Sequence, residues 1–157
     1  MPRLSYALAL VVVLAGSGLG GCGGDTSSDL NEPGEPPFPD AAGIYDLRGR
    51  FDRGVPGDTI TGTLRLEQPT RESGALTGTI TLNMILNGES VSLPESPVDN
   101  PSVTPDGGLT FSLSTLSTGA FWTFNGTLSG DVVTGRHTLR LDKGNLAGPW
   151  RADRVSR

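Results

Sequence analysis

The sequence is poor in the residues that build disulfide frameworks, metal sites and aromatic cores. Its 157 residues include one cysteine, one histidine and only 6 % aromatic side chains. A lone cysteine excludes an internal disulfide framework, and a lone Cys/His pair excludes a Cys/His zinc cluster. The net charge of −5 argues against nucleic acid as a partner, because that partner needs a basic surface. The length allows one domain and excludes two full cores.

Catalytic motifs are also missing. The chain has no Gly-x-Ser-x-Gly elbow, and no spacing places an acid and a nucleophile around His137. Carboxylates are scarce at the positions expected to face inward, which disfavours a paired acid/base site. We therefore predict that the protein is not an enzyme and uses no metal and no cofactor.

The first residues have the layout of a secretory signal. Arg3 precedes an almost wholly apolar run over residues 4–15, which is too short to span a bilayer of roughly 20 residues. The sequence Leu19-Gly20-Gly21-Cys22 then resembles the lipobox of bacterial lipoproteins. That resemblance implies cleavage after residue 21 and acyl chains, palmitate among them, on Cys22. The alternative is an ordinary signal peptide or a weak anchor helix with a free thiol.

The lipoprotein resemblance also implies a location. Gly23 stands where inner-membrane retention in that family commonly uses Asp, so we expect an outer-membrane lipoprotein of the bacterial cell envelope, facing the periplasm or the surface. Residues 22–40 hold five acidic and no basic residues, together with four prolines. Such a segment buries too little apolar surface to order itself, so residues 22–42 are predicted to be a disordered tether. The remaining residues 43–157 form the predicted domain.

A repeated unit dominates that domain, in which an apolar residue, a glycine and a bulky residue alternate with other residues. Alternation places the three members of each unit on one face of a strand, and an inward glycine lets the strand bend. The six units are Leu47-Gly49-Phe51, Ile60-Gly62-Leu64, Leu76-Gly78-Ile80, Phe124-Gly126-Leu128, Val133-Gly135-His137 and Leu146-Gly148-Trp150. We predict an all-β fold, an eight-stranded antiparallel up-and-down β-barrel, with a β-sandwich as the alternative. The expected strands are 43–52, 58–68, 75–86, 89–93, 109–114, 119–129, 132–142 and 145–155.

Three two-residue turns fix the expected register, namely Asn87-Gly88, Gly130-Asp131 and Lys143-Gly144. The first pairs Met84 with Val91 and Leu82 with Leu93. The second pairs Phe124 with His137 and Trp122 with Leu139. The third pairs Leu141 with Leu146, His137 with Trp150 and Gly135 with Ala152. Each pair joins two inward positions, as one buried face requires.

Two short motifs resemble parts of the calycin group, the lipocalin-like and avidin-like barrels. Residues 74–79, Gly-Ala-Leu-Thr-Gly-Thr, are similar to an early hairpin of avidin-type proteins, and Gly148-Pro149-Trp150 is similar to the lipocalin Gly-x-Trp. The resemblance implies a barrel that can hold a small molecule. It transfers no binding residue, because lipocalins carry this Trp in the first strand and the polar and Trp residues with which avidins hold biotin have no counterpart here.

The candidate ligand-binding residues are Trp122, Phe124, His137 and Trp150, which the register places inside the barrel. One interpretation is a polar anchor, His137, in an aromatic-lined cavity. The other is a core histidine in a filled barrel, since eight strands leave room only for side chains or one small ligand. Arg154 is expected to face inward near the rim.

Residues 94–108 are the longest expected loop and a candidate functional element at the barrel mouth. Two functions fit these observations. The first is a membrane-anchored envelope lipoprotein that binds a small apolar ligand in the lumen. The second is a structural lipoprotein with a filled barrel that docks an envelope protein through its loops or outer face.

Overall fold

The computed structural model describes residues 37–53, 56–114, 119–142 and 144–157. The predicted signal peptide, Cys22 and most of the predicted tether lie outside these residues. Nine strands account for the regular structure of the described part, and none of its segments forms a helix long and apolar enough to cross a membrane. The strands are β1 (Gly43–Arg50), β2 (Thr59–Glu67), β3 (Thr77–Leu86), β4 (Glu89–Pro97), β5 (Asp99–Val103), β6 (Gly108–Ser114), β7 (Phe121–Ser129), β8 (Val132–Leu141) and β9 (Gly144–Ser156).

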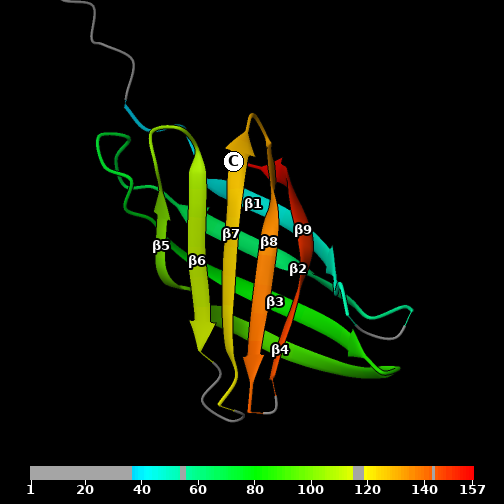
Figure 1. The fold of residues 1–157 in the computed structure, drawn as a ribbon. Helices are drawn as coiled ribbons and strands as arrows, with labels where there is room; N and C mark the ends of the chain where they lie inside the picture. Colours follow the sequence, from blue (N-terminus) through cyan, green and yellow to red (C-terminus); the bar gives the residue numbers. More distant parts are fainter. Residues whose placement is uncertain (1–36, 54–55, 115–118, 143) are drawn as a thin grey trace, which may run out of the picture. The chain divides into compact units, whose positions relative to one another are not determined.

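All strands belong to one antiparallel sheet in the order β4-β3-β2-β1-β9-β8-β7-β6-β5. The sheet is strongly curled, so that β1–β4 cross behind β5–β9 in Figure 1. Its two ends meet at one place, where the Leu76 amide donates to the Pro101 carbonyl (3.2 Å) and the Val103 amide donates to the Gly74 carbonyl (2.8 Å). These bonds join the start of β3 to β5. The predicted all-β antiparallel barrel is thereby confirmed as a class.

The strand count and the long loop were predicted wrongly. Residues 94–97 continue β4 and residues 99–103 form β5, so most of the expected 94–108 loop is strand and the sheet has nine strands instead of eight. The prolines of this segment suggested a loop because proline cannot donate to a ladder. They are tolerated here because β4 and β5 stand at the two ends of the strand order, where one side of each strand needs no complete ladder.

Inward glycines allow the tight curl of the sheet. A Cβ on Gly62 would lie 2.0 Å from the Thr81 carbonyl oxygen, and a Cβ on Gly135 would lie 1.9 Å from the Asn125 carbonyl oxygen. No side chain fits at such distances, so the backbones of neighbouring strands approach one another closely only because these positions are glycine. The repeated glycine unit thus bends the strands as the sequence predicted.

Two of the three predicted registers are confirmed. Met84 pairs with Val91 across the turn between β3 and β4, where Asn87 and Gly88 both have positive φ angles of 52° and 79°. Phe124 pairs with His137 across the turn between β7 and β8.

The third register, between β8 and β9, is off by two residues. The structure pairs Leu141 with Gly144, Leu139 with Leu146, His137 with Gly148, Gly135 with Trp150 and Val133 with Ala152. A slip of two residues keeps every inward side chain inward, because side chains alternate with a period of two. The buried-face argument therefore could not detect it.

The packed domain extends upstream of Gly43. The Phe38 amide donates to the Arg71 carbonyl, and the Arg71 Nε donates back to the Phe38 carbonyl at 3.1 Å. Ala41 is fully buried, and its amide donates to the Gln68 side chain. The core itself is formed by the inward side chains of all nine strands and of the segments next to them.

Candidate functional site

The four predicted ligand-binding residues lie together inside the barrel. β7 supplies Trp122 and Phe124, β8 supplies His137 and β9 supplies Trp150. Each is at most 5 % exposed. The centroid of the Phe124 ring lies 5.4 Å from that of Trp150 and 5.9 Å from that of His137. These residues form a single aromatic cluster, in which offset and edge-to-face contacts are the favoured geometry.

Both ring nitrogens of His137 are engaged. Its Nε2 lies 2.9 Å from the Arg50 carbonyl oxygen, and its Nδ1 lies 3.3 Å from the indole nitrogen of Trp122. Because the indole N–H can only donate, Nδ1 accepts and Nε2 carries the proton, which makes the imidazole neutral. Burial lowers the pKa of His137, and the hydrogen bond to the Arg50 carbonyl opposes this shift in part. This arrangement matches the core-histidine interpretation.

Two further rings close around the cluster. Phe111 stacks on Phe124 with centroids 4.7 Å apart, and Phe51 meets His137 edge-on at 5.0 Å. The Trp150 indole donates to the Asn125 carbonyl at 3.1 Å. The middle of the lumen is therefore filled with aromatic side chains whose polar atoms are satisfied. The predicted ligand-binding role of Phe124, His137 and Trp150 stays a prediction.

An apolar cavity lies beside this cluster, at one end of the barrel. It has a volume of about 330 Å³ and is bordered by the turn end of the β3–β4 hairpin on one side and by β7 and β8 on the other. Apart from Ser92, every lining residue is apolar. The lining consists of Leu82, Met84, Val91, Ser92, Leu93, Pro94, Ala120, Trp122, Leu139 and Leu141. We call this cavity the mouth.

Of the four predicted residues, Trp122 alone lines the mouth. The sequence did place Leu82, Met84, Val91 and Leu93 on the inward face through the Asn87-Gly88 turn. It gave no sign that these side chains border empty space, because the alternation pattern is the same for a filled and an unfilled part of a lumen.

The opposite end of the barrel is closed by Arg154. This side chain is only 4 % exposed and lies 3.6 Å from an Asp40 carboxylate oxygen and 3.5 Å from an Asp131 carboxylate oxygen. Its Nε donates to the Tyr45 hydroxyl at 3.1 Å, and that hydroxyl donates to the Ala41 carbonyl at 2.9 Å. Burial raises the pKa of Tyr45, against the opposing effect of the Arg154 charge. The expected inward position of Arg154 near the rim is confirmed, and we call this end the closed end.

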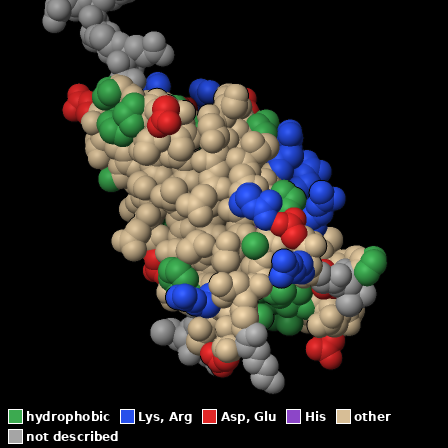
Figure 2. Space-filling model, in the orientation of Figure 1, with side chains coloured by type: hydrophobic (Ala, Val, Ile, Leu, Met, Phe, Trp, Pro, Cys, Tyr) green, Lys and Arg blue, Asp and Glu red, His purple; other side chains and the backbone are tan. Residues whose placement is uncertain are grey.

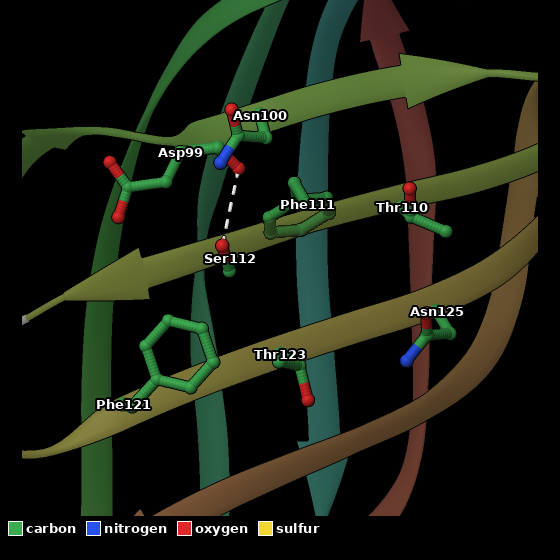
Figure 3. Close-up of a pocket in the computed structure, with 8 residues that line it drawn as sticks. All are labelled: Asp99, Asn100, Thr110, Phe111, Ser112, Phe121, Thr123 and Asn125. Carbon is green, nitrogen blue, oxygen red and sulfur yellow. Dashed lines mark hydrogen bonds between the residues drawn. The ribbon is translucent and has the colours of Figure 1, made fainter.

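A second, polar hollow of about 280 Å³ lies on the outer face of β5, β6 and β7. Figure 3 shows the Phe121 ring near one end of it and the Asn125 amide near the other, with Ser112 bonded to the Asp99 carbonyl between them. The pairing of β5 with β6 shifts register between Asp99 and Ser102, and Asn100 within this bulge has a φ of 49°. Bulges of this kind re-aim a side chain, and here the redirected residue borders the hollow.

Basic side chains gather along one side of the sheet, as the blue groups at the right of Figure 2 show. Much of this charge is neutralised locally. Arg151 and Arg48 both contact Asp153 and hold its pKa down at about 2, and Arg136 pairs with Asp52. Among the described residues, no group of three His, Cys, Asp or Glu side chains is placed to hold a metal ion.

Comparison with known proteins identifies the fold. Neither the protein-family models nor the curated proteins contain a match. Among solved structures, the chain is similar to bradavidin2 in its complex with biotin, with 24 % identity, a TM-score of 0.50, and coverage of 73 % of this chain and 97 % of that one. EF1p2_mFAP2b bound to DFHBI also matches, with 14 % identity, a TM-score of 0.48, and coverage of 72 % and 92 %. The similarity to bradavidin2 shows an avidin-like barrel, in agreement with the calycin resemblance.

Proposed function

We propose that this chain is a lipid-anchored envelope protein whose barrel holds a small apolar molecule in the mouth. The observation that carries the proposal is a cavity of about 330 Å³ with almost no polar group in its wall. Ligand sites of proteins start at roughly 300 Å³ and are mostly apolar, so the mouth suits one small ligand. Bradavidin2, a similar barrel, is known in complex with biotin, which supports a binding role over an enzymatic one.

The wall of the mouth sets the chemistry of its ligand. Buried polar groups of a ligand need hydrogen-bond partners, and each one left without a partner weakens binding. The only polar lining residue is Ser92, whose hydroxyl already donates to Asn83 at 2.7 Å. The ligand is therefore a hydrocarbon group with its polar atoms, if any, directed out of the mouth.

Binding is tested with N-phenyl-1-naphthylamine, a neutral dye that fluoresces in apolar surroundings. We expect saturable binding of one dye per chain, and native mass spectrometry of the purified protein reports any ligand that is already bound. Leu93→Trp places a larger side chain in the mouth and lowers dye affinity at least about tenfold, since displaced apolar contact is worth more than 1.4 kcal/mol. Ser90→Trp on the same strand is the matched control, because Ser90 is exposed and pairs with the outward-facing Ile85.

Absence of saturable dye binding, or an equal loss in the Leu93→Trp and Ser90→Trp variants, contradicts the proposal. A buffer-exchanged protein with no bound ligand is compatible with it, provided that the dye binds.

The lipid anchor is supported by the sequence alone, through the lipobox around Cys22. Two or more acyl chains suffice for lasting membrane attachment, at about 0.8 kcal/mol per buried methylene. In cells fed a fatty-acid analogue, the wild-type chain incorporates the label and the Cys22→Ser variant does not. Equal labelling of the two contradicts the anchor.

A second candidate function is favoured by the polar hollow on β5–β7. There Phe121 is 39 % exposed, and the side-chain amides of Asn100 and Asn125 make no hydrogen bond to another described residue. An exposed ring beside free amides suits docking of an envelope protein. A photo-crosslinking residue at position 121 captures that protein in cells, whereas one at Val155 does not. Failure to capture any protein at position 121 counts against this function.

A further inference from the structure

Exposed apolar side chains concentrate at the end of the barrel where the mouth opens. Five large hydrophobic residues of the described chain are exposed. Four of them lie at strand ends around the mouth, namely Ile85 at 43 %, Val91 at 50 %, Phe121 at 39 % and Leu141 at 38 % exposure. In Figure 1 the β3–β4 turn, the start of β7 and the end of β8 all lie toward the bottom of the view. These four residues form the apolar rim.

The rim is continuous with the mouth, since Val91 and Leu141 belong to both. The closed end has the opposite character, with Arg154, Asp40 and Asp131 in contact and Arg157 close to Asp40. One end of the barrel therefore offers an uninterrupted apolar path from solvent into the lumen, and the other offers charge.

Charged groups of both signs stand beside the apolar rim. Arg140 and Asp142 flank Leu141, and Glu89 lies next to the turn between β3 and β4. All three are exposed, and none forms an ion pair with another described residue. This arrangement matches a zwitterionic headgroup, whose phosphate suits Arg140 and whose ammonium suits either carboxylate.

We infer that the apolar rim docks onto a bilayer surface of zwitterionic lipid and that the mouth takes an acyl chain directly from it. The inference rests on the proposed ligand-binding function and names the ligand class and its source. Apolar side chains next to an acyl layer leave water when they insert, which favours docking in proportion to the area buried. An acyl chain that slides into the mouth keeps its headgroup at the rim, where no polar group has to be buried.

The experiment uses the chain with Trp150→Phe, so that Trp122 in the mouth wall is its only tryptophan. Phosphatidylcholine vesicles with brominated acyl chains quench this fluorescence only when a chain comes next to Trp122. We expect quenching that does not depend on salt and does not increase when anionic lipid is added. Adding Val91→Ser and Leu141→Ser weakens quenching by vesicles at least about tenfold. Val155→Ser, at an exposed residue away from the mouth, leaves it unchanged.

A brominated fatty acid free in solution is the second arm of the experiment. It reaches the mouth without a bilayer, so the rim variant loses quenching by vesicles and keeps most of the quenching by the free acid. Quenching by the free acid without quenching by vesicles overturns the docking inference and leaves the proposed function standing. No quenching in either arm overturns both.

Two other occupants of the apolar rim are outcomes of the same test. If the chain is a dimer by light scattering and the rim variant is a monomer, a second copy covers the rim and the inference is wrong. Quenching that rises with anionic lipid and falls with salt contradicts it as well, because the attraction would then be electrostatic.

Discussion

His137 makes the stability of the fold depend on pH. Its pKa is lowered in the folded state chiefly by burial, so the unfolded chain binds a proton at a higher pH than the folded one. Stability is therefore fully present above the unfolded pKa of about 6.5 and falls as the pH drops below it, by at most about 1.4 kcal/mol per pH unit. Urea unfolding at pH 7.5, 6.5 and 5.5 measures this slope.

His137→Gln is the matched variant for that measurement. A glutamine amide donates to the Arg50 carbonyl and accepts from the Trp122 indole, as the neutral imidazole does, and does not titrate. The variant is expected to lose the slope between pH 7.5 and 5.5 with only a moderate loss of stability at pH 7.5. An unchanged slope shows that another group is responsible.

At the scale of single residues, the sequence predicted which way side chains face but not what they border. His137, Phe124 and Trp122 are inside, as alternation requires. Which inward residues line empty space depends on the summed volumes of side chains from strands far apart in sequence. Leu139 of β8 and Leu93 of β4 meet across the mouth, for example, and no local pattern contains that information.

Arg154 links the segment before β1 to β9, and its loss should weaken the closed end. Arg154→Met removes two ion pairs and the bond to Tyr45 from a side chain that is 4 % exposed, with an expected cost of about 2 kcal/mol in the free energy of unfolding. Arg136→Met is the control, because Arg136 is 62 % exposed and its pair with Asp52 is worth about 0.5 kcal/mol or less. Chemical denaturation compares the two, and equal small losses would show that the Arg154 contacts contribute no stability.

At the scale of elements, turn chemistry predicted register where it was specific. Asn87-Gly88 suits a turn with two positive φ angles and placed β3 against β4 correctly. Lys143-Gly144 is a weaker turn pattern, and a two-residue slip leaves all faces unchanged, so Leu141 was paired with the wrong residue. Proline misled the assignment of residues 94–108 because its effect depends on a strand's place in the sheet, which is a non-local property.

Over the whole molecule, protection against unfolding should be uneven. β4 ends the strand order, pairs along one side only and is exposed on both faces, whereas β8 is paired on both sides. Amide hydrogen exchange should therefore be at least about tenfold faster in β4 than in β8. Because Val91 and Leu93 line the mouth, a bound apolar ligand should slow exchange in β4 most of all. Equal protection of β4 and β8 without ligand contradicts this expectation.

A lumen with one charged, plugged end and one apolar end has a single doorway. Arg154 and the aromatic cluster obstruct the path beyond the mouth, so a guest molecule leaves the way it came. Such a vessel can store or carry its cargo, but it cannot conduct cargo from one side to the other. Uptake and release then share one barrier, the movement of the β3–β4 hairpin, and any change that stiffens this hairpin should slow both by the same factor.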